Sequence, residues 1–207
     1  MKDYSQSGEQ EFILEFFRNK PDGRFLEIGA MDGISYSNTY ALLLKGWEGL
    51  YFEPSPLAFA KLLETTKDYK ALCVNEGLAD FRGELAWYDG GMNALGTTDK
   101  AHKEVWEKAG AKFQDSVMRV TDWEHLCLHF GTNFDLISID TEGTSQHLFK
   151  TMPYKLNPAM VIVEHDGKDD TEFERIGYGI AVRNDLNLIM THSTYFTRIH
   201  LGTFGSK

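Results

Sequence analysis

The residues best suited to chemistry in this chain gather where apolar segments end. A short apolar segment runs into the loop "GAMDG" at residues 29–33, and the next apolar segment stops at Glu53, 20 residues after Gly33. This is the outline of a nucleotide-binding βαβ unit. A dinucleotide fingerprint needs a glycine in the middle of the loop so that the backbone can approach a pyrophosphate. Here Met31 and Asp32 occupy the loop, so the pattern predicts a ligand without phosphates.

S-adenosylmethionine meets these requirements. Its ammonium and sulfonium groups suit glycine carbonyls and acidic side chains, because opposite charges attract. Its ribose has two hydroxyl groups, and the two oxygens of the Glu53 carboxylate can accept hydrogen bonds from them. A strand, glycine turn and helix can also form without a ligand, but Glu53 in register argues against that reading. We therefore expect S-adenosylmethionine as the cofactor, with an NAD-dependent dehydrogenase as an outside alternative.

Acidic residues and a histidine follow two later apolar segments. Asp140 and Glu142 end the segment 134–143, and His165 and Asp166 end the segment 159–166. Asp140, Glu142 and His165 are the predicted catalytic residues, because an alcohol acceptor needs a general base. Side chains alternate between the two faces of a strand, so it stays open whether Asp140 and Glu142 face one site. For His165, the alternative to a catalytic role is a structural one.

A divalent metal is a weaker alternative at the same place. Asp140, Glu142 and Asp166 could give oxygen ligands to Mg²⁺, which would acidify an acceptor hydroxyl. The sequence has no compact metal signature, so a metal is not favoured.

Two regions could bind the acceptor. In the first 20 residues, a candidate N-terminal helix and lid, Gln6 and Glu9 could close over the methionine end of the cofactor, with helix capping as the alternative. The insert 80–116 is a candidate substrate lid, and its aromatic and polar side chains could stack on a sugar or ring substrate or form an ordinary satellite core. The predicted substrate residues are Gln6, Glu9, Tyr88 and Asn93, with Trp87 and Trp106 nearby.

The elements that must position these residues alternate between strand and helix. Such a chain predicts an α/β fold with a doubly wound, mainly parallel sheet and ligands beyond the carboxyl ends of the strands. A capping box at Thr121 and Glu124 predicts one helix start. Segment 78–97 is expected to be a hairpin or a mobile loop, and 178–199 a closing antiparallel hairpin. The predicted strands are 24–29, 49–53, 69–77, 134–143 and 159–166, and the predicted helices are 9–19, 37–46, 55–66, 99–113 and 144–152.

Composition restricts the class of protein. The 207 residues suit one globular domain, 1–207. A formal net charge of −10 disfavours a nucleic-acid partner and leaves a small-molecule acceptor as the expected one. The N-terminus has no signal-peptide core and the chain has no long apolar run, so we expect a cytoplasmic protein without a membrane partner. The oligomeric state stays open, with a homodimer as one candidate.

Five segments in order resemble the FkbM-type S-adenosylmethionine-dependent methyltransferases. They are "SQSGEQ", "FLEIGAMDGISYSNTY", "GWEGLYFEPSP", "FDLISIDTEG" and "VIVEHD". The resemblance implies a class I (Rossmann-like) methyltransferase fold and methylation of a hydroxyl oxygen on a sugar or other small molecule. It also implies cofactor-binding residues at Glu27, Gly29, Ala30, Asp32, Gly33, Ser37, Glu53, Pro54, Asn75, Glu76, Gly77 and Asp140.

One position departs from the family pattern. The family often has an acidic residue two positions after the Asp-x-Glu-Gly glycine, and this chain has Ser145 there. The departure puts in doubt any acid, base or metal role of that position in relatives. Methylation of nitrogen and a non-catalytic S-adenosylmethionine-binding scaffold therefore stay as alternatives.

Overall fold

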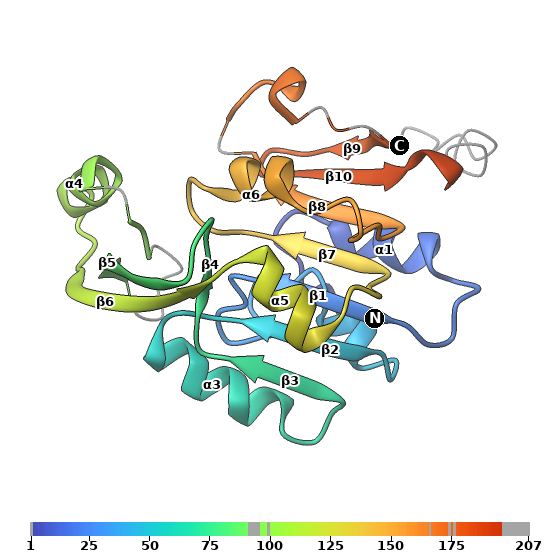
Figure 1. The fold of residues 1–207 in the computed structure, drawn as a ribbon, viewed down its shortest axis with the longest axis horizontal. Helices are drawn as coiled ribbons and strands as arrows, with labels where there is room; N and C mark the ends of the chain where they lie inside the picture. The colour runs from blue at the N-terminus through green and yellow to red at the C-terminus, as the bar shows by residue number, and fades with distance from the viewer. Residues whose placement is uncertain are drawn as a thin grey trace.

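A computed structural model describes residues 2–90, 96–98, 100–165, 167–173, 175 and 177–195 of the chain. Its centre is a seven-stranded sheet in the order β3-β2-β1-β7-β8-β10-β9 (Figure 1). The strands are β1 (Arg24–Ile28), β2 (Glu48–Phe52), β3 (Ala71–Val74), β7 (Leu136–Ile139), β8 (Met160–Glu164), β9 (Tyr178–Arg183) and β10 (Asn187–His192). The first five are parallel, and β9 and β10 form the antiparallel hairpin expected at the C-terminus. The predicted α/β class and mainly parallel sheet are confirmed.

The strand order reverses between β1 and β7. The chain runs outward from β1 through β2 to β3, and later runs outward on the other side from β7 to β8. In open α/β sheets, ligands bind beyond the carboxyl ends of the strands at such a switch point. The topology therefore places the loops after β1 and β7 beside each other at the expected ligand-binding edge.

Helices cover both faces of the sheet because side chains alternate along its strands. Leu26 and Ile28 of β1 belong to one buried cluster, whereas Phe25 belongs to the other. The first cluster includes side chains of α5 (Trp123–Phe130) and α6 (Ser145–Thr151), which lie in front of the sheet in Figure 1. The second includes side chains of α1 (Glu9–Phe16), α2 (Tyr40–Leu43) and α3 (Pro56–Thr66).

Two helix starts show which capping predictions hold. Ser55 caps α3, with its hydroxyl accepting from the Ala58 N–H and Pro56 at the first helical position. The capping box expected at Thr121 is wrong by one residue, because the Asp122 carboxylate accepts from the His125 N–H instead. Thr121 is still part of a strand, so its backbone is extended where a cap was predicted.

The insert forms a second, three-stranded sheet in the order β4-β6-β5. Its elements are β4 (Gly77–Leu78), β5 (Gly83–Asp89), α4 (Lys100–Lys108) and β6 (Gln114–Thr121). A hairpin or loop was expected within 78–97. Instead β5 pairs with β6, and the paired residues are 25 or more positions apart in the chain. The predicted strand 69–77 is also divided, because β3 joins the large sheet and β4 joins the small one.

None of the helices in the described part of the chain is long and apolar enough to span a bilayer. Two 3-10 helices complete the described part of the chain: η2 (Asp170–Phe173) follows β8, and η3 (Ser193–Tyr195) follows β10.

Candidate functional site

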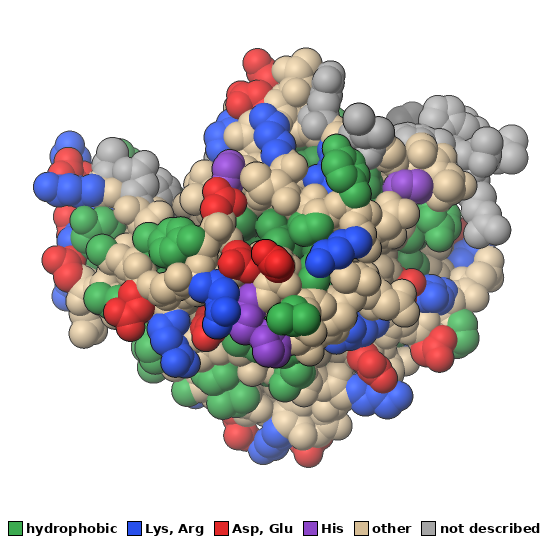
Figure 2. Space-filling view, in the orientation of Figure 1, with side chains coloured by type: hydrophobic (Ala, Val, Ile, Leu, Met, Phe, Trp, Pro, Cys, Tyr) green, Lys and Arg blue, Asp and Glu red, His purple; other side chains and the backbone are tan. Residues whose placement is uncertain are grey.

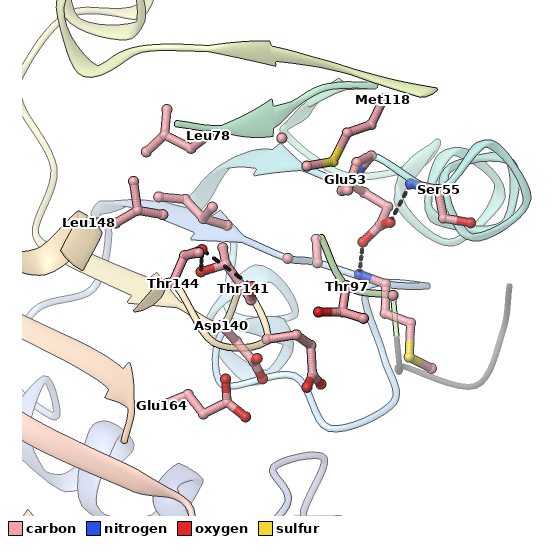
Figure 3. Close-up of a pocket in the computed structure, with 18 of the residues that line it drawn as sticks. Glu53, Ser55, Leu78, Thr97, Met118, Asp140, Thr141, Thr144, Leu148 and Glu164 are labelled. Carbon is pink, nitrogen blue, oxygen red and sulfur yellow. Dashed lines mark hydrogen bonds between the residues drawn. The ribbon is translucent and has the colours of Figure 1, made fainter. Parts of the chain in front are cut away.

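A cavity of about 640 Å³ lies at the carboxyl ends of the parallel strands. Figure 3 shows Asp140 and Glu164 at one end of it, and Leu78 and Met118 on the opposite side. The volume is typical of small-molecule sites. The last residues of β1 and β8 and the loops after β1, β2 and β7 supply much of its polar lining, and the insert supplies much of its apolar lining.

The turn after β1 requires glycine at its first position. Gly29 has φ +82°, and a Cβ there would lie 1.7 Å from the carbonyl oxygen of Asp140. Gly29 therefore lets the loops after β1 and β7 meet at the switch point. The backbone enters the left-handed region again at Met31, with φ 49°.

Two residues predicted to bind the cofactor shape this turn instead of lining the cavity. The Asp32 carboxylate accepts hydrogen bonds from the N–H groups of Ile34 and Ser35. Gly33 leaves room for Leu62, whose Cδ1 would lie 2.7 Å from an added Cβ. Direct contact of Asp32 and Gly33 with a ligand in the cavity is thus a prediction that the geometry does not support.

Glu53, directly after β2, is held in place by backbone hydrogen bonds. Its two carboxylate oxygens accept from the N–H groups of Met31 and Ser55, each at 2.7 Å, as Figure 3 shows. A carboxylate has about four lone-pair sites, so acceptor capacity remains for ribose hydroxyls. Burial raises the pKa of Glu53 to about 7.

Glu27 is the second buried carboxyl group of the cavity lining. Its oxygens accept from the Ser37 hydroxyl at 3.1 Å and the Thr39 hydroxyl at 2.7 Å. Burial raises the pKa of Glu27 to about 7 despite these hydrogen bonds. A positively charged group beside Glu27 would favour its ionised form.

The segment after β3 contributes less than predicted. The Asn75 amide donates to the carbonyl oxygens of Glu53 and Pro54, which fixes the loop after β2. Glu76 lies 4.0 Å from Arg119 in a long ion pair. Only Gly77 of the predicted trio lines the cavity, together with the predicted residues Ala30, Ser37 and Pro54.

Three carboxylates meet at the acidic end of the cavity. One oxygen of each of Asp140, Glu142 and Glu164 lies within 4.8 Å of the others. Asp140 and Glu142 therefore face one site, which the sequence left open. Glu142 reaches it from the left-handed region, with φ 48°.

Glu164 is the site residue that sequence reasoning missed. It ends β8, and the available signal was its place as the last residue of an apolar strand. The strand was expected to continue to Asp166, so Glu164 was placed inside the strand and not at its end. Asp166 itself lies outside the described residues.

Ser145, the first residue of α6, stabilises this loop. Its hydroxyl accepts from the Thr141 N–H at 2.9 Å and lies 3.5 Å from Glu164 Oε2. Its side chain is buried, and its hydrogen bond to Thr141 holds the loop that carries Asp140 and Glu142.

His165 is not in the cavity lining. It is buried, Nδ1 accepts from the Gly167 N–H, and Nε2 donates to the Asn184 carbonyl oxygen. Both nitrogens are therefore engaged, and the geometry does not support the predicted role as base. His147 on α6 lines the cavity instead, with Nε2 hydrogen-bonded to the Asp80 carboxylate.

The predicted substrate residues divide. Gln6 lines the cavity, whereas Glu9 is buried elsewhere and accepts from the side-chain amides of Asn184 and Asn187. Tyr88 lies outside the lining, with the Lys103 ammonium 4.2 Å from its ring centroid. Their neighbours Trp87 and Trp106 do line the cavity, and Asn93 lies outside the described residues.

Comparison with known proteins agrees with this geometry. Among solved structures, the chain is similar to the one described as "Putative methyltransferase yhhF from Escherichia coli", with 12% sequence identity and a TM-score of 0.50. The match covers 92% of this chain and 88% of that one, and shows a shared fold. No curated protein matches the chain.

The family comparison shows more than a shared fold. The model of the methyltransferase FkbM domain matches residues 27–190, which contain the end of β1, the glycine turn, Glu53 and all three clustered carboxylates. This span is most of the chain, and it confirms the resemblance seen in the sequence. The chain therefore belongs to the FkbM family of methyltransferases.

Proposed function

We propose that this methyltransferase uses S-adenosylmethionine to methylate a hydroxyl oxygen of a sugar or other small molecule. The observation that carries the proposal is the pair of buried carboxyl groups, Glu27 and Glu53, on either side of the glycine turn. Buried carboxyl groups in a cavity indicate a ligand that supplies positive charge and hydrogen-bond donors.

The cofactor would extend along the cavity. Its ammonium would lie beside Glu27 and its ribose hydroxyls beside Glu53. The apolar side chains of Leu78 and Met118, on the side of the cavity away from Asp140, suit the adenine ring. This placement directs the sulfonium methyl group toward the acidic end.

The reaction needs alignment and one proton acceptor. The acceptor oxygen attacks the methyl carbon as the carbon–sulfur bond breaks, and the bonding electron pair stays on sulfur to give S-adenosylhomocysteine. The hydroxyl proton passes to a carboxylate, and Asp140, Glu142 and Glu164 are the available bases at that end. Holding both reactants in line contributes much of the rate enhancement.

Calorimetry tests the cofactor assignment directly. S-adenosylmethionine and S-adenosylhomocysteine are expected to bind one site per chain with saturation, and NAD is expected not to bind. The control variant Glu48→Gln changes an exposed carboxylate outside the cavity and should bind like the parent protein. Saturable binding of NAD, or no binding of either sulfur ligand, would refute the proposal.

A further inference from the structure

We infer that the acceptor carries no anionic group within the cavity, so that carboxylate, phosphate and sulfate derivatives are excluded. The inference rests on the proposed function, because it concerns the second ligand of the same cavity. It starts from the charges of the whole lining and not from any one cluster.

The described lining contains no lysine and no arginine. Its carboxyl and imidazole side chains are Glu27, Glu53, Asp80, Asp140, Glu142, Glu164 and His147. The histidine is hydrogen-bonded to Asp80, so it has a carboxylate partner already. Residues 91–95 and 99 of the insert also contain no lysine or arginine. An anion entering the cavity would therefore meet no lysine or arginine side chain among the described lining residues, and the histidine there already has a carboxylate partner.

The cofactor does not reverse this balance. S-adenosylmethionine carries two positive groups and one carboxylate, a net charge of +1. Glu27 and Glu53 are placed to meet its ammonium and ribose. Asp140, Glu142 and Glu164 still line the end of the cavity where an acceptor must approach the methyl group, and a negatively charged group placed beside carboxylates is repelled.

The part of the lining that the insert supplies favours an apolar face on the acceptor. Leu85 and Trp87 of β5 and Trp106 of α4 line the cavity, and Trp87 is itself buried. Figure 2 shows a notch between the α4 end of the insert and the rest of the molecule. A flat apolar surface, such as an aromatic ring or one face of a sugar, is what such side chains contact well.

This charge pattern indicates whether a sugar acceptor is methylated while it is attached to a phosphate carrier. A sugar bound through a nucleoside diphosphate or a phosphate would bring negative charge into the cavity. Methylation would therefore act on the free sugar, or after transfer of the sugar from its phosphate carrier to an uncharged molecule.

Matched probes test the inference at saturating S-adenosylhomocysteine. One set is 4-hydroxybenzylamine, 4-hydroxybenzyl alcohol and 4-hydroxybenzoate, and the other is glucosamine, glucose and glucose 6-phosphate. Titration followed by ligand-observed NMR should give dissociation constants at least tenfold weaker for the anionic member of each set. An anion that binds as tightly as its neutral partner, or no binding by either set, would overturn the inference.

Variants show whether the cavity causes the preference. The double variant Glu142→Gln and Glu164→Gln should reduce the ratio of anionic to neutral dissociation constants at least threefold. Glu84→Gln removes an exposed carboxylate from β5, outside the lining, and should leave the ratio unchanged. An equal change in both variants would refute the assignment. Calorimetry with S-adenosylhomocysteine comes first, so its failure counts against the proposed function, whereas binding followed by failed probes counts against this inference alone.

Discussion

Acidification should weaken cofactor binding, because both buried cofactor-site carboxyl groups must ionise to meet the ligand. Burial raises the pKa of Glu27 and of Glu53 to about 7. A group with this pKa is about three-quarters ionised at pH 7.5 and about 3% ionised at pH 5.5. If binding needs the ionised form, the dissociation constant rises about 25-fold for each carboxyl group that takes part, or about 2 kcal/mol.

The assay is calorimetry of S-adenosylhomocysteine binding from pH 5.5 to 7.5, a range in which the ligand ammonium stays protonated. Below pH 7 the plot of log Kd against pH should approach a slope between about −1 and −2, because Kd rises as the pH falls. Glu27→Gln should make that slope less steep by about one, since it removes one titrating group. A dissociation constant that stays the same between pH 5.5 and 7.5 would refute the reasoning.

The sign of the effect on the ligand-free protein is opposite. Both pKa values are higher in the folded protein than the ordinary value of 4.5. Each group therefore contributes stability that is fully present below pH 4.5 and is lost as the pH rises through about 7.

Four further changes separate the roles of the site. Glu53→Ala should weaken S-adenosylmethionine binding at least tenfold while cooperative unfolding is retained; unchanged affinity in calorimetry would contradict the ribose assignment. Asp140→Asn should lower turnover of an accepted substrate about 100-fold or more with little change in cofactor affinity, and equal activity would remove Asp140 from the mechanism. Gly29→Ala should cost about 3 kcal/mol or more in urea unfolding, whereas Gly46→Ala, also at positive φ but with no atom within 4 Å, should cost about 1–2 kcal/mol; similar losses would disprove the close-approach argument. EDTA should leave turnover unchanged, because carboxylates alone supply the base, and restoration of lost activity by Mg²⁺ would show that a metal is required.

The sequence by itself determined the parallel core, the glycine turn and the place of Glu53. These features depend on residues that are close in the chain. Apolar runs that alternate with helical segments predict parallel strands, and a glycine turn between two such strands predicts a ligand at their carboxyl ends. The motif order also identified the FkbM family, which the family comparison confirms.

The tertiary structure decided which side chains meet. Glu164 joins Asp140 and Glu142 because β8 pairs beside β7 and ends in register with it, a relation between segments 20 residues apart. His165, the next residue, points to the other side of the strand and is bonded to the C-terminal hairpin. A shift of one residue reverses the direction of a side chain at a strand end, so composition and spacing alone could not choose between these neighbours.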